Sequence, residues 1–430
     1  MLRGAAMLGG TDFLRQAAEA AQKRAEHVRQ NGFDWQAALM CNAQGVALPN
    51  LANVAHALRH APQLAGMFIY DEMQCHSVIT RTVPQSNMTP VDTLRHVTDA
   101  DVSAVQEWLQ HAAMKRLGIA VTHQAVDQVA REAPFHPVRL YLSALEWDGT
   151  RRIDQWLAKY LGAARSRYAT RIGRMFLIAM VARVMQPGCK ADYMLILEGK
   201  RGSGKSNACS ILGGDWFSDA LPDLATAGKD VAIHLEGKWV IEIAELSALS
   251  KAESGLLKSF VSRTEEKYRP PYGRKDIKAP RQCVFIGTTN KSVYLKDATG
   301  GRRFWPVKTG RIKLNNLATD RDQLLAEALI AFKNGEKWWP DRGFENRYVF
   351  PEQAARRESD AWLEPIASFV ANMQEVTIHM VAEKALSLRV DRIGKAEQNR
   401  IAEVLEELGW TRGKRTASKR PWFPPAGVTQ

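Results

Sequence analysis

The segment Gly199–Ser206, GKRGSGKS, strongly limits how this chain can fold. It has the spacing GxxxxGK[ST], in which glycines let backbone N–H groups turn inward around phosphate groups. The apolar run YMLILE (193–198) precedes it, and SNACSIL (206–212) can continue as a helix after it. A strand, a glycine-rich loop and a helix N-terminus in this order predict a phosphate-binding loop at the edge of an α/β sheet.

Each position in this loop has an expected task. The Lys205 ammonium can reach the β- and γ-phosphate oxygens, and the Ser206 hydroxyl can be a ligand of Mg²⁺. The expected cofactors are therefore ATP and Mg²⁺. The alternative is a chance glycine-rich turn, and the segments downstream argue against it. The predicted cofactor-binding set is Gly199, Gly202, Gly204, Lys205, Ser206 and Asn207.

Two carboxylates lie near the end of the predicted strand GKWVIEIAEL (237–246), at Glu242 and Glu245. Open α/β sheets bind ligands at the carboxyl ends of their strands. One carboxylate can complete the Mg²⁺ shell while the other polarises the attacking water. Residues three apart face opposite sides of an extended strand, so both can serve only if the strand ends between them. We assign Glu242 to the metal and Glu245 to the water, although the reverse assignment stays open.

Two further motifs suit hydrolysis of a nucleotide. The predicted strand QCVFIGTTN (282–290) ends in Asn290, whose amide can orient the water and sense the γ-phosphate. Then TGGRRFWPV (299–307) offers Arg302 and Arg303, and a guanidinium group can stabilise the transition-state charge, often from a neighbouring subunit. The sequence leaves open which arginine acts.

The charge balance favours a polyanionic partner. The chain has 59 Lys and Arg against 46 Asp and Glu, a net charge of +13, which favours nucleic acid first and an anionic membrane second. The segment 264–282, TEEKYRPPYGRKDIKAPRQ, mixes cations with tyrosines, a pattern that suits single-stranded DNA. The predicted DNA contacts there are Tyr268, Arg269, Tyr272, Arg274, Lys275 and Lys278.

We predict three units: an α+β assembly or accessory region at 1–134, an α/β core with a preceding helical segment at 135–345, and a basic unit at 364–430. In the last unit, Ile401, Val404, Leu405 and Leu408 share one helix face, and a basic turn follows. This pattern predicts a winged-helix-like domain that contacts duplex DNA through the helix around 401–408 and the wing. The alternative is a small basic helical cap that supports a ring. The predicted wing contacts are Arg412, Lys414, Arg415, Lys419 and Arg420.

Neither a membrane span nor a disulfide framework is expected. The longest apolar stretch, 175–185, is broken by Arg183 and is far shorter than a transmembrane helix. The N-terminus lacks the apolar core of a secretion signal, so we expect a cytoplasmic protein. The five cysteines are scattered and form no CxxC pair, which argues against a zinc site.

Taken in order, HPVRLYLSALEWDGTRRID, LEGKRGSGKS, KWVIEIAEL, FIGTTN, ATGGRRFWPV and DRDQLLAEAL make the chain resemble the virulence-associated protein E family. These are ATPases encoded by phages and mobile islands and related to superfamily 3 helicases. The resemblance covers roughly 135–335. It implies a P-loop NTPase core of the AAA+ class that assembles into a ring, expected to be a hexamer.

The resemblance also implies roles for single residues. Lys205 and Ser206 would be the Walker A pair, Glu242 and Glu245 the Walker B acids, Asn290 the sensor, and Arg302 or Arg303 the finger. A hairpin at 268–280 would contact one DNA strand in the pore of the ring. Many relatives carry an upstream primase domain with paired acidic residues, and the N-terminal region here has no such pair, so primer synthesis is not predicted.

The expected function is an ATP-hydrolysing DNA motor, a helicase or helicase loader acting on single-stranded or forked DNA with other replication proteins of a phage, prophage or mobile island. One alternative is an ATP-switched DNA-binding regulator that unwinds nothing. A small-molecule kinase could own the same loop, but it would leave Asn290, the arginine pair and the basic C-terminal turn without a use.

Overall fold

The computed structural model describes residues 12–30, 32–86, 91, 94–248, 250–269, 275–295, 301–358, 360–389, 392–414 and 420–425. The chain divides into two compact units, Met1–Arg356 and Arg357–Gln430. Within the described ranges, every helix is too short or too polar to cross a membrane.

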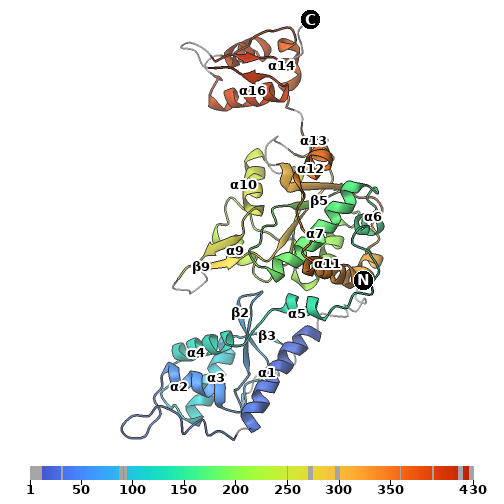
Figure 1. Ribbon diagram of the computed structural model, residues 1–430. Coiled ribbons are helices and arrows are strands. Elements are labelled where there is room, and N and C mark those ends of the chain that lie inside the picture. Colours follow the sequence, from blue (N-terminus) through green and yellow to red (C-terminus); the bar gives the residue numbers. More distant parts are fainter. Residues whose placement is uncertain are drawn as a thin grey trace. The chain divides into compact units, whose positions relative to one another are not determined.

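The first part of the larger unit is a four-stranded sheet of order β3-β2-β1-β4 with helices on both faces (Figure 1). Ile69 and Val78 pack against the first helix, whereas Phe68 and Ile79 pack against the next three. This split follows from the alternation of side chains along a strand. The elements are α1 (Asp12–Gln30), α2 (Leu51–His60), β1 (Phe68–Asp71), β2 (His76–Ile79), β3 (Arg95–His96), α3 (Asp99–Ala112), α4 (Ile119–Arg131) and β4 (Pro134–Phe135).

The core of this unit is a five-stranded, entirely parallel sheet of order β11-β5-β10-β7-β6. The predicted α/β class is therefore confirmed. In this order, β10 lies between β5, which precedes the glycine-rich loop, and β7, which carries Glu242. The strands are β5 (Met194–Glu198), β6 (Phe217–Ser218), β7 (Val240–Ile243), β10 (Val284–Thr289) and β11 (Phe304–Lys308).

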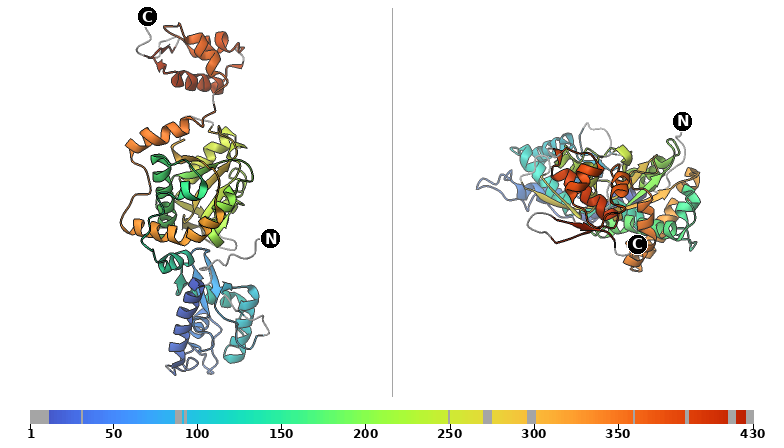
Figure 2. Two further views of the ribbon diagram at one scale, coloured as in Figure 1. Left: turned by 90° about the vertical axis from the view of Figure 1, so that its right-hand side faces the viewer. Right: turned by 90° about the horizontal axis from the view of Figure 1, so that it is seen from above.

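Helices cover both faces of the parallel sheet, as Figure 2 shows from a second side. Leu195 and Leu197 of β5 pack with α7, α8 and α11, whereas Met194 and Ile196 pack with α9 and α10 on the other face. Strands buried on both sides in this way read as continuous apolar runs, which is why MLIL was recognisable. The helices are α5 (Pro137–Ala144), α6 (Trp156–Leu161), α7 (Arg167–Met185), α8 (Lys205–Gly213), α9 (Lys229–His234), α10 (Lys251–Val261), α11 (Leu314–Lys333), α12 (Arg342–Phe344) and α13 (Phe350–Ala354).

Local sequence explains the ends of the longest core helix, α7. Ser166 caps its N-terminus by accepting a hydrogen bond from the Ala169 N–H, and the helix ends at Met185, two residues before Pro187.

The connection between β11 and α11 passes very close to the backbone of Gly162. Gly162 has φ +66°, and a Cβ there would lie 2.7 Å from the Arg311 nitrogen and 2.9 Å from the Gly310 carbonyl carbon. Gly162→Ala is expected to lower the free energy of unfolding by about 2–4 kcal/mol, because strain at positive φ adds to a backbone clash. Urea unfolding followed by tryptophan fluorescence would measure this. Gly149→Ala is the matched control, with φ +81° but open space around the added methyl, and should cost only about 1 kcal/mol. Equal losses in the two variants would contradict the role of the clash.

The second unit is small and has its own core around Ile366, Val381, Ile401 and Trp422. A helix is followed by a bridge at Val376, a short helical turn, a long helix and a two-stranded antiparallel sheet. Val376 pairs with Trp422, so three chain segments lie side by side. The elements are α14 (Leu363–Val370), α15 (Ile378–Met380), η5 (Val381–Ala385), α16 (Lys395–Glu407), β12 (Thr411–Arg412) and β13 (Trp422–Phe423).

Candidate nucleotide-binding site

The glycine-rich loop connects β5 to α8, as the sequence predicts. Gly202 and Gly204 have φ +75° and +91°, a region that side-chain-bearing residues rarely adopt. At Gly199 a Cβ would lie 2.5 Å from the Thr309 hydroxyl, so this position has no room for a side chain. The three glycines therefore serve backbone curvature and close approach. Asn207 is exposed in the first turn of α8.

Lys205 is the first residue of α8 and turns back over the loop. Its Nζ donates hydrogen bonds to the carbonyl oxygens of Gly199 (2.8 Å) and Lys200 (2.9 Å). The side chain is only 9% exposed, and burial lowers the pKa of its ammonium group. The loop thus encloses one cation at the N-terminal end of a helix, which is a suitable environment for phosphate.

Three elements converge on the carboxylate of Glu242. Oε1 accepts hydrogen bonds from Ser206 Oγ and from Thr288 Oγ1, each at 2.7 Å. Glu242 is 1% exposed, and its Oε2 has no hydrogen-bond partner among the described residues. A buried carboxylate oxygen beside a serine hydroxyl is a donor set that suits a hard divalent cation such as Mg²⁺. The structure brings the two predicted metal ligands together.

Glu245 lies just beyond the same strand. β7 ends at Ile243, so the strand does end between the two glutamates. Glu245 is exposed and has φ +52°, a strained conformation for a residue with a side chain. The turn frees this carboxylate from the strand alternation and leaves it at the loop's edge of the sheet.

Asn290 follows β10 directly and is exposed. Because β10 pairs with both β5 and β7, its tip lies between the loop and the glutamate strand. The Gly199 N–H donates to the carbonyl of Thr289 at 3.1 Å, which ties this tip to the start of the loop. The predicted sensor position therefore belongs to the same edge of the sheet.

The arginine pair lies at the opposite end of the strands, where β11 begins. Arg302 and Arg303 precede β11, whose first residue pairs with Met194 and whose last pairs with Glu198. Five residues of strand, about 16 Å, separate them from the loop. Arg303 donates to Ser262 Oγ at 2.5 Å, whereas Arg302 is exposed. The structure does not bring either arginine to the phosphate loop of its own chain.

Sequence reasoning missed a buried ion pair under the loop. Glu198, the last residue of β5, receives two hydrogen bonds from Arg356, at 2.8 and 3.0 Å, and one from Tyr294 OH at 2.8 Å. The backbone N–H groups of Tyr294 and Leu295 donate to the Arg356 carbonyl. In the sequence, the only sign of this network is the carboxylate of Glu198 at the end of an apolar strand. Its partner, Arg356, is 158 residues further along the chain.

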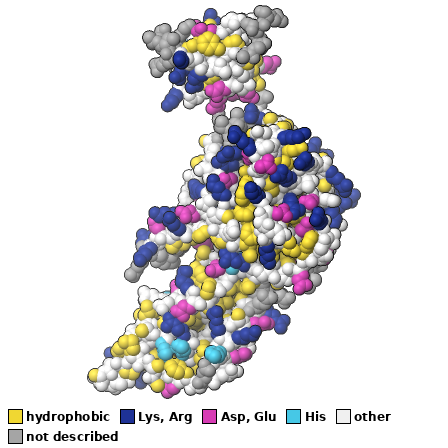
Figure 3. All heavy atoms as spheres, viewed as in Figure 1, with side chains coloured by type: hydrophobic (Ala, Val, Ile, Leu, Met, Phe, Trp, Pro, Cys, Tyr) yellow, Lys and Arg dark blue, Asp and Glu magenta, His cyan; other side chains and the backbone are white. Residues whose placement is uncertain are grey.

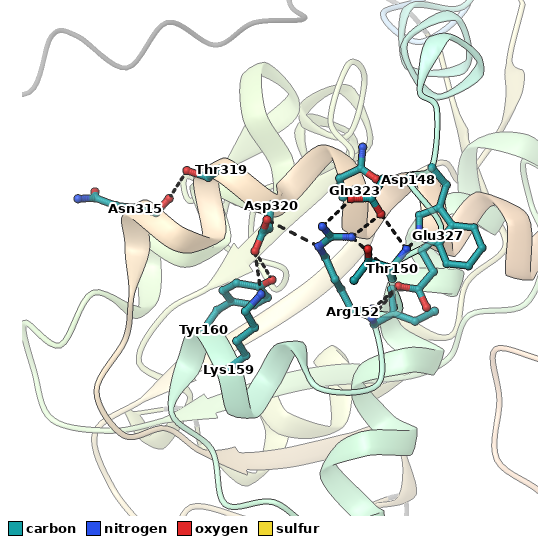
Figure 4. A network of polar contacts seen from close by, with 12 residues as sticks. Asp148, Thr150, Arg152, Lys159, Tyr160, Asn315, Thr319, Asp320, Gln323 and Glu327 are labelled. Atoms are coloured by element: carbon teal, nitrogen blue, oxygen red, sulfur yellow. Dashed lines mark hydrogen bonds and ion pairs between the residues drawn. The ribbon is translucent and has the colours of Figure 1, made fainter.

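A second network explains the motif EWDGTRRID, which had no assigned role (Figure 4). Arg152 binds Asp148 through two hydrogen bonds of 2.7 Å, and the backbone N–H groups of Arg152 and Ile153 donate to Glu327 of α11. Asp320 on the same helix accepts from Lys159 and Tyr160. These contacts hold α11, whose first residue, Leu314, lies against Gly204. The motif positions the helix that supports the loop.

The segment between α10 and β10 contains a hairpin, with β8 (Glu265–Tyr268) paired antiparallel to β9 (Ile277–Pro280). Charged side chains gather on it (Figure 3). A buried ion pair, Glu266 with Arg281, stabilises its base. On the outward face Lys267 lies opposite Lys278. Lys267 lies 3.7 Å from Asp276, just before β9, and Lys278 lies 3.5 Å from Glu265 of β8, yet both lysine side chains stay largely exposed. Sequence reasoning overlooked Lys267.

Of the predicted hairpin contacts, Tyr268 must be corrected. It is 5% exposed and its hydroxyl donates to Glu236, so its ring cannot stack on a base. The alternation of the strand turns it inward, and burial together with this hydrogen bond raises its pKa. Arg269, Lys275 and Lys278 are exposed. Tyr272 and Arg274 lie outside the described residues.

In the second unit, Arg412, Lys414 and Arg420 are exposed, and Arg415 and Lys419 lie outside the described residues. The apolar face of the predicted contact helix lies inside the unit. Ile401, Val404 and Leu405 are in the core of the unit, so the part of α16 around 401–408 cannot present its apolar face to DNA. The same periodicity that located the helix marks these residues as interior.

Comparison with known proteins gives one family. The model of the virulence-associated protein E-like domain matches residues 142–358. No curated protein matches the chain. Among solved structures, an apo structure of the NrS-1 C-terminal region has a TM-score of 0.44 and 13% identity, covering 84% of this chain and 96% of that one. An A-form apo structure of the same region has a TM-score of 0.46 and 11% identity over the same shares.

Proposed function

Because the chain belongs to the virulence-associated protein E-like family, we propose that it is an ATP-hydrolysing DNA motor, a P-loop NTPase acting as a helicase or helicase loader in phage-type replication. The observation that carries the proposal is the convergence of Ser206, Glu242 and Thr288 beneath a loop that encloses Lys205. A kinase would also need a phosphate-binding loop. It would have no use for Glu242, Glu245 and Asn290 together at the carboxyl ends of the strands.

The residues have distinct roles in this proposal. Lys205 and the loop N–H groups bind the β- and γ-phosphates, and Ser206 with Glu242 Oε2 would hold Mg²⁺, which neutralises charge on the phosphate oxygens. Glu245, outside the strand and exposed, accepts a proton from the attacking water. Asn290 orients that water from the tip of β10.

The arginine comes from a second copy of the chain. Arg302 lies about 16 Å from its own loop, at the opposite end of the strands, so in a head-to-tail ring it can face the loop of a neighbour. Arg303 is held by Ser262 in its own chain, which favours Arg302 as the finger. A site shared between subunits makes hydrolysis depend on assembly.

The experiment that tests the motor compares ATP hydrolysis and forked-duplex unwinding by the wild type, with and without single-stranded DNA. Hydrolysis stimulated by DNA, with strand separation, is the expected result. Stimulated hydrolysis without separation would favour the alternative of an ATP-switched DNA-binding regulator or a loader. A chain that does not bind ATP would exclude all of these functions.

Thr288 is expected to position the metal-side carboxylate, because it donates to the same Glu242 oxygen as Ser206. Thr288→Val keeps the shape and removes a hydrogen bond to a charged group, worth about 1.5–3 kcal/mol. The Mg²⁺ concentration for half-maximal hydrolysis should rise roughly tenfold or more. Thr288→Ser, which restores the hydroxyl, should behave like the wild type. An unchanged Mg²⁺ requirement in the valine variant would show that Ser206 alone orients Glu242.

The hairpin is proposed to contact the DNA strand through its exposed lysines. Removing the side chains of Lys275 and Lys278 together should reduce DNA stimulation of hydrolysis several-fold and leave basal hydrolysis intact, because both side chains are exposed on the hairpin. Glu265→Gln, on the same face, is the control and should not weaken stimulation. If basal and stimulated rates fell together, the damage would be to folding.

The second unit is proposed to be a winged-helix-like domain that binds duplex DNA. Its three-segment sheet, the helix α16 and the hairpin that follows support this assignment. A small supporting cap remains the alternative, and the surface of α16 bears on the choice.

A further inference from the structure

The two halves of α16 expose different chemistry. In the first two turns the exposed polar side chains are Lys395, Gln398 and Asn399, and in the last two turns they are Glu403, Glu406 and Glu407. The apolar face of the helix, with Ile401, Val404 and Leu405, is buried. The first two turns carry one half-buried acid, Glu397, whereas the exposed polar side chains of the last two turns are all acids, so the N-terminal half suits a polyanion better.

The cations of the second unit are also unevenly distributed along its sequence. The whole unit is almost neutral, with 11 Lys and Arg against 10 Asp and Glu, yet the segment 411–420 after α16 has five cations and no acid. Two other arginines are used inside the unit, since Arg400 binds Asp360 and Arg357 binds Glu407. Within the described part of the unit, Lys395, Lys414 and Arg420 form no ion pair. Figure 3 shows Lys and Arg side chains gathered on one flank of this unit.

We propose that the first two turns of α16 enter the major groove of duplex DNA, where Asn399 contacts base edges and Lys395 contacts a phosphate. This inference deepens the proposed function, since it gives the motor a duplex anchor that is separate from its nucleotide site. Recognition helices commonly contact bases with their N-terminal residues. An amide suits adenine, whose N6 and N7 it can bind together.

Asn399 is the better candidate of the two amides. Gln398 donates a hydrogen bond to the Ile393 carbonyl at 3.3 Å, which ties its side chain to the preceding turn. Asn399 is exposed on the face that it shares with Lys395, four residues earlier. A contact surface for an acidic protein segment would use the same lysine but gain nothing from an amide.

The test uses the full chain without ATP and a labelled, blunt-ended 30-base-pair duplex. Lys395→Ala should weaken binding uniformly across sequences and reduce the salt dependence by about one phosphate contact. Asn399→Ala should lose, by about tenfold, a preference for adenine at one position in duplexes selected by the wild type from a random pool. Glu406→Ala, exposed on the same helix, is the matched control and should bind like the wild type.

Two measurements, ATP hydrolysis and duplex binding, separate this inference from the proposed function. ATP hydrolysis should be unaffected by Lys395→Ala and Asn399→Ala, so loss of duplex binding with normal hydrolysis supports the inference. Unchanged duplex binding in both variants, or equal loss in Glu406→Ala, would overturn it even if the wild type proves to be a motor. Duplex binding that depends on Asn399 in a chain that hydrolyses no ATP would keep the inference and reject the motor.

Discussion

Arg302→Ala is expected to lower ATP hydrolysis by about 10³-fold or more, the effect typical of losing an arginine finger. The expected reason is that the exposed guanidinium group stabilises the transition-state charge on a neighbour's γ-phosphate. Arg303→Ala is the matched control, because its guanidinium already binds Ser262 and its loss should affect stability more than rate. Nucleotide affinity of the Arg302 variant should remain close to that of the wild type.

Mixing variants tests whether the arginine acts between chains. Lys205→Ala has an intact arginine and a defective loop, and Arg302→Ala has the reverse. Equimolar mixing should restore part of the activity, because some interfaces then combine an intact loop with an intact arginine. Two inactive variants that stay inactive together, although they co-assemble, would place the arginine in its own chain or outside the reaction. Arg302 lies about 16 Å from the loop of its own chain, which argues against action within one chain.

Local patterns in the sequence predict the core elements well. The strand at 194–198, the loop and α7 are each specified by neighbouring residues, through apolar runs, glycines and caps. The order of strands is not local. That β10 lies between β5 and β7 depends on pairings between residues 91 and 44 positions apart, such as Ile286 with Leu195 and Val284 with Val240. This order is what brings Thr288 to Glu242.

The prediction for the hairpin went wrong because composition does not say which way a side chain faces. Tyr268 belongs to a basic, tyrosine-bearing segment, yet strand alternation turns it inward and leaves Lys267 outward. The Glu198–Arg356 pair joins residues that no local motif connects. By contrast, the assignment of Glu242 and Glu245 rested on where a strand would end, and β7 does end between them.

Lys205→Ala is expected to reduce ATP hydrolysis by about 10²- to 10³-fold, the usual loss when one preorganised donor to a developing charge is removed. The Lys205 ammonium is nearly buried and already lies in the loop, so little reorganisation precedes its contact with phosphate. Lys200→Ala is the control, because Lys200 is exposed in the same loop and contributes only its backbone carbonyl to Lys205. Binding of the labelled duplex should persist in Lys205→Ala, since the second unit has its own core. If hydrolysis survived this substitution, the loop would not be the catalytic phosphate site, and the roles of Ser206 and Glu242 would fall with it.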